Sequence, residues 1–104
     1  MVKLKGVSFI SSSFSPDSKH FAYKAIEAGK EFIVLNDKEG KRYNWVAGFI
    51  FSPDSKQFAY MAGEAGKQFI VLNNKEGKRY DWVGKPTFSP DSKHFAYKAK
   101  EVED

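Results

Sequence analysis

A repeat of 37 residues is the feature that most constrains what this chain can fold into. The hexapeptide FSPDSK begins at Phe14, at Phe51 and at Phe88, so its spacing is a strict 37 residues. Residues 14–50 and 51–87 are identical at 27 of 37 positions without a gap. The third copy repeats the first twelve residues of the first copy. Such a repeat predicts equivalent modules that stack and share a core between neighbours.

The repeat also sets the expected domain organisation. A chain of 104 residues has room for one domain, and we expect a single array of repeats over residues 1–104. Its expected parts are an outer strand (1–9), repeat one (14–50), repeat two (51–87) and a partial repeat three (88–104). Near-identity without gaps fits a natural duplication, a truncated natural protein or a designed chain, and these origins stay open.

Each repeat is predicted to begin with two strands. Residues 19–25 alternate in polarity and place Phe21 and Tyr23 on one face, as a strand does. Residues 27–30 then form a turn, in which Gly29 is placed for a positive φ. The next run, residues 31–36, is short, apolar and rich in β-formers, which is typical of a strand buried on both faces.

The second half of the repeat is predicted to hold a loop and two further strands. Residues 36–41 are polar, with a glycine near the end, and predict a hairpin loop. Residues 42–46 predict a third strand with aromatic side chains at alternate positions, and residues 47–51 a fourth that leads into the next FSPDSK. The predicted unit is therefore four antiparallel strands without a helix.

The SPDS segment is predicted to form a tight turn. Proline suits the second turn position because its φ is restricted, and aspartate can accept hydrogen bonds from backbone amides of the turn. Serine stands at a position that would suit glycine, which is tolerated if the residue adopts the right-handed α conformation. The equivalent sets are Pro16, Asp17 and Ser18; Pro53, Asp54 and Ser55; and Pro90, Asp91 and Ser92.

These motifs resemble a known repeat. The FSPDSKxFAY element, followed by the GKxFIVLN and GKRYxW segments, is similar to WD-like propeller repeats with the signature FSPDG-K-x-[IL]-A-[YF]. The family includes the C-terminal domain of the periplasmic Tol-system protein and the propellers of prolyl-oligopeptidase-type peptidases. The resemblance covers residues 14–100 and implies four-stranded β-propeller blades. It assigns no activity, because the shared residues build turns and blade cores.

The number of repeats departs from the family pattern. Closed propellers typically have four or more blades, whereas this chain holds about 2.5–3. We therefore expect an all-β homo-oligomer closed by self-assembly, with a six-bladed dimer favoured. In that dimer, residues 4–9, which align with 41–46, would join the inner strands 86–88 and 94–99 of a neighbour. Larger rings, domain-swapped assemblies and a non-propeller packing of the strands stay open.

Composition excludes several classes of protein. The chain has no cysteine, which excludes disulfides, thiol catalysis and zinc–thiolate sites. No apolar run approaches the ~20 residues of a membrane-spanning helix, so no membrane partner is expected. No signal peptide is evident at the N-terminus, which predicts a cytoplasmic location. No phosphate-binding loop, dinucleotide fingerprint or nucleophile elbow is present, so we expect neither a cofactor nor an enzyme.

Three groups of polar residues are candidates for metal or catalytic sites. His20 and His94 occupy one repeat position, but the second copy has Gln57 there, which favours solvated strand residues over ligands or bases. The repeated aspartates of the SPDS segments could form a carboxylate ring, but their role as turn formers is favoured. The hairpin loops lack the oxygen ligands that calcium requires. We expect no catalytic or metal site.

One group of residues remains as a candidate binding surface. Aromatic and arginine side chains alternate near the end of each repeat, and such residues form sugar-stacking platforms or protein hot spots. The candidates are Arg42, Tyr43, Trp45, Arg79, Tyr80 and Trp82. Packing between neighbouring blades is the favoured alternative for the tryptophans. Nucleic-acid binding is disfavoured because glutamates are interleaved with the basic residues and dilute their electrostatic field, which leaves a net charge of only +4.

The expected function follows from these exclusions. We expect a non-enzymatic β-propeller fragment that self-assembles and acts as a scaffold or a protein-interaction module. One alternative is the binding of a carbohydrate or peptide through the channel or loops of the assembled ring. Another is an accessory propeller domain of a larger hydrolase.

Overall fold

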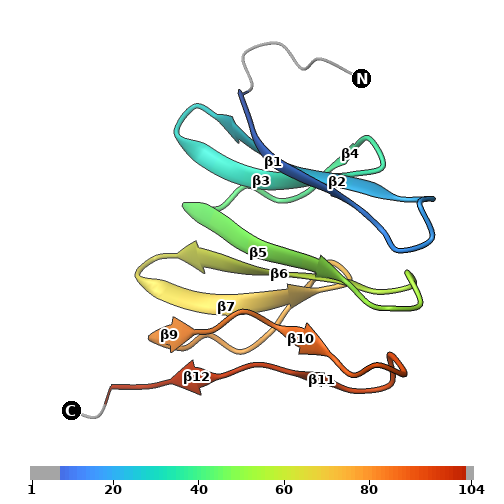
Figure 1. Cartoon of the computed structure of the whole chain (residues 1–104). Helices are drawn as coiled ribbons and strands as arrows, with labels where there is room; N and C mark the ends of the chain where they lie inside the picture. The colour runs from blue at the N-terminus through green and yellow to red at the C-terminus, as the bar shows by residue number, and fades with distance from the viewer. Residues whose placement is uncertain (1–7, 103–104) are drawn as a thin grey trace.

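The computed structural model describes residues 8–102, and this part of the chain is all-β, with twelve strands and no helix. The strands form two four-stranded and two two-stranded antiparallel sheets. The two short sheets lie end to end and are treated together as the third sheet, so that three layers are stacked in chain order (Figure 1). Each stacked unit starts 37 residues after the one before it, at Ser8, Trp45 and Trp82. The prediction of antiparallel four-stranded sheets is therefore confirmed for the first two units.

The first sheet is a meander in which each strand pairs with the next one along the chain. Its strands are β1 (Ser8–Phe14), β2 (Phe21–Glu27), β3 (Lys30–Leu35) and β4 (Lys38–Glu39). The β2–β3 turn has positive φ at Ala28 and at Gly29, where φ is 77°. This confirms the role predicted for that glycine, because such turns match the twist of a hairpin.

The second sheet repeats the first. Its strands are β5 (Trp45–Phe51), β6 (Phe58–Glu64), β7 (Lys67–Leu72) and β8 (Lys75–Glu76). The register of β5 shifts between Ala47 and Ile50, where Gly48 has a φ of 61°. The corresponding strand β1 shifts register between Phe9 and Ser11. The two shifts overlap along the first strand, because Phe9 and Ser11 are equivalent to Val46 and Gly48.

The third sheet has only the first two strand positions. Its segments are β9 (Trp82–Val83), β10 (Thr87–Phe88), β11 (Phe95–Ala96) and β12 (Ala99–Lys100). β10 pairs with β11, and β12 pairs with β9, so the sheet is a two-stranded ribbon with a gap in each strand. The gap between β9 and β10 contains Pro86, which has no backbone N–H to donate.

The predicted elements between residues 36 and 46 are wrong in detail. The loop predicted for 36–41 is instead a two-residue turn, because Asn36 and Asp37 both have positive φ and reverse the chain at once into β4. The strand predicted for 42–46 is divided between two sheets. Tyr43 bridges Glu31 at the outer edge of the first sheet, whereas Trp45 already begins β5.

The serines of the three SPDS turns also differ from expectation. Ser18, Ser55 and Ser92 have φ of 63°, 64° and 62°, so they are left-handed and not right-handed. The amide of each bonds to the carbonyl at the start of its turn, as Ser18 N donates to Ser15 O over 2.9 Å. The turn thus imposes the conformation that glycine would adopt more easily.

The N-terminal prediction lies largely beyond the described residues. Of the outer strand expected at 1–9, residues 1–7 fall outside the described range. Ser8 and Phe9 belong to β1, where they pair with Ile26 and Ala25.

Two of the three buried clusters lie between sheets, and the third, made of Tyr23, Ala25, Phe32 and Val34, lies within the first sheet. Ala22 and Ile33 of the first sheet pack with Val46, Tyr60 and Phe69 of the second in one buried cluster. A second cluster joins the second and third sheets, with Ala59, Ile70 and Val83 at its centre. Consecutive residues of β3 and β7 are buried, which confirms the prediction of a strand covered on both faces. The fully or almost fully buried residues of these strands are Phe32, Ile33, Val34, Phe69, Ile70 and Val71.

Candidate functional site

The SPDS turns form a hydrogen-bonded ladder from sheet to sheet. Within the first turn, Ser15 Oγ and Lys19 N donate to Asp17 Oδ1 over 2.6 and 2.9 Å. The amide of Asp17 donates to Ser55 Oγ of the next turn over 3.0 Å. The amide of Asp54 donates in the same way to Ser92 Oγ over 3.0 Å. Each turn therefore bonds to the next through one amide and one hydroxyl.

The ladder accounts for the electrostatics of its carboxylates. The hydroxyl of the preceding serine lowers the pKa of Asp17, Asp54 and Asp91 below the ordinary value of 3.8, and a backbone amide two residues later adds to the effect. Hydrogen bonds to the ionised form favour that form. These aspartates are therefore ionised acceptors at neutral pH.

This electrostatic arrangement predicts a loss of stability in acid. A carboxylate whose pKa is lower in the folded chain stabilises it fully above the ordinary pKa, and the contribution disappears as the pH falls through the lowered value. We expect the urea midpoint to drop as the pH falls below the ordinary pKa of 3.8. Asp54→Asn should reduce the slope of that drop, because Asn carries no titrating group. An unchanged slope in this variant would contradict the role given to Asp54.

An ionic cluster joins the outer edges of the first two sheets. Lys41 Nζ lies 3.0 Å from Glu76 Oε2, and the hydroxyl of Tyr43 donates to the same oxygen over 2.7 Å. Arg79 contacts Glu76 over 3.3 Å and Glu64 over 2.8 Å. Hydrogen bonding by Tyr43, and then by Lys41, lowers the pKa of Glu76. The cluster thus connects residues of one repeat to the carboxylates of the next.

Two tyrosines within the same interface are held protonated. Burial raises the pKa of Tyr60 to about 12, with a smaller contribution from the charge of Glu76. Burial, followed by the bond to Glu76, raises the pKa of Tyr43 even further. Both hydroxyls are therefore neutral at physiological pH, and that of Tyr43 donates to Glu76.

The structure places the six predicted binding residues in different surroundings. Tyr43 and Arg79 meet at Phe69, with the Tyr43 ring 5.4 Å and the guanidinium 4.4 Å from the Phe69 ring centre. Arg42 lies 3.9 Å above the ring of Phe32 and pairs with Glu27 and Glu39 of its own sheet.

The other aromatic members of this set differ in exposure. Trp45 is half-buried and covers Gly63 of the neighbouring strand. Tyr80 packs edge-on against Tyr97 of the third sheet at 6.4 Å. Trp82 is 46% exposed and borders a hollow of about 460 Å³ with Asp81, Lys100 and Val102. Of these six residues, Trp82 has the most exposed aromatic ring.

Two equivalent grooves lie between the sheets. The groove between the first and second sheets has a volume of about 330 Å³ and is lined by Ile33, Gly40, Tyr43, Phe58, Tyr60 and Val71. The groove between the second and third sheets has a volume of about 490 Å³ and is lined by Ile70, Leu72, Glu76, Gly77, Phe95 and Tyr97. The repeat therefore generates a groove at the same place twice, lined by apolar and charged side chains.

Sequence reasoning missed the residues that join one sheet to the next. Glu64 and Glu76 were treated only as charges that dilute a basic surface, and the serines of the SPDS turns only as turn residues. The sequence does show that Lys41 and Glu64, which form an ion pair, belong to different copies of the repeat. A repeat fixes which residues are equivalent, but the contacts between copies depend on how the sheets stack.

Within residues 8–102, no group of three or more histidine, aspartate or glutamate side chains is arranged to hold a metal ion. The described segment also contains no helix long and apolar enough to cross a membrane. Comparison with known proteins found no protein-family model, no curated protein and no solved structure that matches this chain.

Proposed function

We propose that this chain is a non-enzymatic β-propeller unit that self-assembles and serves as a scaffold or protein-interaction module. The observation that carries the proposal is the third sheet, which has two strand positions where the first two sheets have four. Its outer edge pairs with no strand among the described residues. An unpaired edge favours association with another chain. A second copy of this chain is the simplest partner for this unpaired edge.

Blade geometry is supported by the way in which the sheets repeat. Two four-stranded antiparallel meanders lie face to face, and a third begins in the same manner (Figure 1). Equivalent hydrogen bonds, such as those of the SPDS ladder, recur from one interface to the next. Two copies with two full blades and one partial blade each would give a ring of six blades. Cyclic closure is the usual solution for such repeats.

The polar residues support a structural function. The carboxylates of the SPDS turns accept bonds within their turns, and those of the ionic cluster are paired with lysine or arginine. His20 Nδ1 lies 2.8 Å from Asn36 Nδ2, and its ring stacks on Phe51. Each of these groups contributes to a turn or to a sheet interface, which supports a structural role for them.

Self-assembly predicts that thermal stability depends on concentration. Association of folded chains stabilises them by mass action, so the melting temperature should rise as protein concentration increases. We expect a rise of several degrees over a hundredfold range of concentration, measured by circular dichroism. A melting temperature that is constant over this range would contradict the proposal.

Carbohydrate binding at Trp82 is a second candidate, because this exposed ring borders a hollow with a lysine and an aspartate. Such rings stack on the apolar faces of sugars. A panel of simple sugars should then quench tryptophan fluorescence saturably, and Trp82→Ala should abolish the quenching while Trp45→Ala retains it. A flat titration would contradict carbohydrate binding and leave the scaffold as the only proposed function.

A further inference from the structure

The two ends of the stack expose surfaces that are buried between the sheets inside it. At the N-terminal end, Phe14 of β1 is 66% exposed, whereas its equivalent Phe51 is 9% exposed. Ser18 is exposed, whereas its equivalents Ser55 and Ser92 are 5% and 6% exposed. We call Phe14 and Ser18, with the half-buried Phe21 beside them, the head of the chain.

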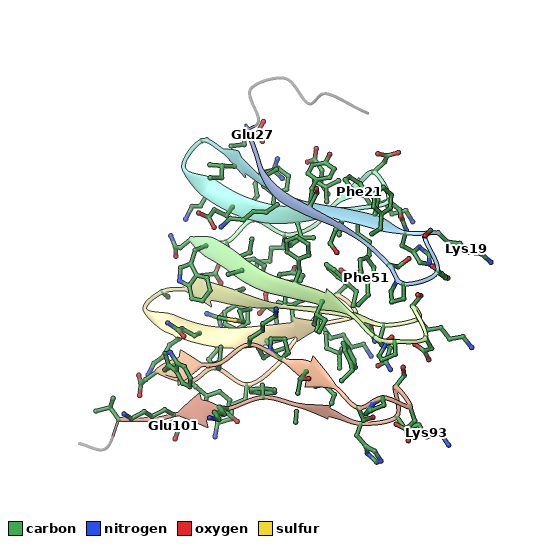
Figure 2. The ribbon with its side chains drawn as sticks, viewed as in Figure 1. Lys19, Phe21, Glu27, Phe51, Lys93 and Glu101 are labelled. Atoms are coloured by element: carbon green, nitrogen blue, oxygen red, sulfur yellow. The ribbon has the colours of Figure 1, made fainter. Side chains whose placement is uncertain are left out.

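The residues that cover the equivalents of the head come from the preceding repeat. The ring of His20 stacks on Phe51, with ring centres 6.4 Å apart and planes inclined by 20°, and Figure 2 places Phe51 between the first two sheets. The amide of Asp17 donates to Ser55 Oγ over 3.0 Å. Ala22 is fully buried in the same interface.

The C-terminal end exposes the same covering residues without a following sheet. His94 is equivalent to His20 and is exposed. Ala96 is exposed, whereas Ala22 and Ala59 at the same repeat position are fully buried. No other residue within the described range accepts a hydrogen bond from the amide of Asp91. We call Asp91, His94 and Ala96 the tail.

The head and the tail therefore carry the two halves of one contact. We propose that the tail of one copy of this chain seats on the head of a second copy as repeat one seats on repeat two. His94 stacks on Phe14 of the second copy, the amide of Asp91 donates to its Ser18 Oγ, and Ala96 packs beneath the second copy's β1 and β2. This inference rests on the proposed self-assembly and names its interface.

The extent of the two surfaces agrees with this arrangement. The tail belongs to a sheet with only the first two strand positions. The open residues of the head lie on β1, on β2 and in the turn between them. Four side chains on this face of the first sheet, Tyr23 and Ala25 on β2 and Phe32 and Val34 on β3, are already buried. The tail therefore faces the part that is open, around Phe14, Ser18 and Phe21 at the turn end of β1 and β2.

Such an interface is head-to-tail, and this distinguishes it from the symmetric contacts of most dimers. In a symmetric contact, one patch meets the same patch on the second copy. In the contact inferred here, two different patches meet, so each copy has one unused head and one unused tail until the assembly closes. Blocking either patch should then prevent closure.

The test uses two full-length variants, each blocked at one end. Phe14→Lys blocks the head and Ala96→Arg blocks the tail, and both positions are exposed in the isolated chain. By light scattering after size exclusion, each variant alone should lose the assembly mass of the parent chain, with an unchanged circular dichroism spectrum. An equimolar mixture should regain a dimer, because one intact head can still meet one intact tail.

Cross-linking of single-cysteine variants supplies a second readout that does not depend on affinity. The chain has no cysteine of its own, so Phe14→Cys and His94→Cys each introduce one thiol. A short bismaleimide should join the two variants into a covalent dimer when they are mixed and should leave each variant alone uncoupled. Lys38→Cys, on the exposed strand β4, is the matched control and should not couple to His94→Cys.

The outcomes separate the interface from the self-assembly on which it rests. Retention of the parent mass by both blocked variants, or coupling of Phe14→Cys with itself, would overturn the head-to-tail interface and leave self-assembly intact. Loss of mass in one blocked variant only would also overturn it, because a head-to-tail contact needs both patches. A parent chain that is monomeric at every concentration would overturn both proposals.

Discussion

Replacing Phe69 by alanine is expected to destabilise the folded chain by about 3–5 kcal/mol, as deletion of a fully buried phenylalanine side chain usually does. Phe69 has no exposed surface, and it lies on β7 in the cluster that joins the first two sheets. Its ring contacts Tyr43 from the preceding repeat, and Arg79 covers it. The substitution therefore removes packing both within a sheet and between sheets.

The measurement is urea denaturation followed by circular dichroism, at one low protein concentration for all variants. Phe32→Ala is the matched comparison from the first repeat, because Phe32 is equally buried, and a similar loss is expected. Val102→Ala is the surface control, since this side chain is 70% exposed and should change stability by less than about 0.5 kcal/mol. A loss below about 1 kcal/mol for Phe69→Ala would contradict its place in the core.

The second large effect is expected at Gly63, where a single added methyl group has no room. A Cβ atom there would lie 1.9 Å from Trp45 Nε1 and 2.2 Å from Trp45 Cε2. Contacts this short force the indole or the strand to move, and overpacking of this kind costs about 1–3 kcal/mol. We expect Gly63→Ala to fall in this range and to shift the emission of Trp45 toward that of an exposed indole.

The third repeat supports this expectation. Lys100 stands opposite Trp82 in the register where Gly63 stands opposite Trp45. Trp82 is correspondingly exposed, whereas Trp45 is half-buried. A double-mutant cycle supplies the control: in the background of Trp45→Ala, the change Gly63→Ala should be almost neutral. An equal loss in both backgrounds would show that the indole is not the cause.

Those parts of the fold that depend on local pattern could be predicted from the sequence. The buried strand predicted at 31–36 and the turn at Gly29 follow from hydrophobicity and from backbone freedom over a few residues. The structure confirms the turn and places the strand at Lys30–Leu35, with Asn36 already in the next turn. The division of residues 42–46 between two sheets could not be predicted in this way. It depends on a two-residue turn at Asn36 and Asp37, whose positive φ values start β4 earlier than the glycine at position 40 suggested.

The contacts between repeats were beyond sequence reasoning for a related reason. Ser55 looks like a turn residue within its own repeat, and its hydroxyl becomes an acceptor for Asp17 only because the turns stack. Glu76 likewise lies in a segment whose composition is typical of a solvated hairpin. Its carboxylate nevertheless binds Lys41 and Tyr43 of the preceding repeat. Such pairs are set by the spacing and twist of the sheets, which no single repeat encodes by itself.

The native mass of the chain is the most direct test of the central claim that the repeats continue from one copy into another. It should be measured by light scattering after size exclusion, over a range of loading concentrations. The account predicts one sharp species near twice the chain mass of 11.8 kDa, which corresponds to a closed ring of about six blades. A folded monomer of 11.8 kDa at all concentrations would contradict it.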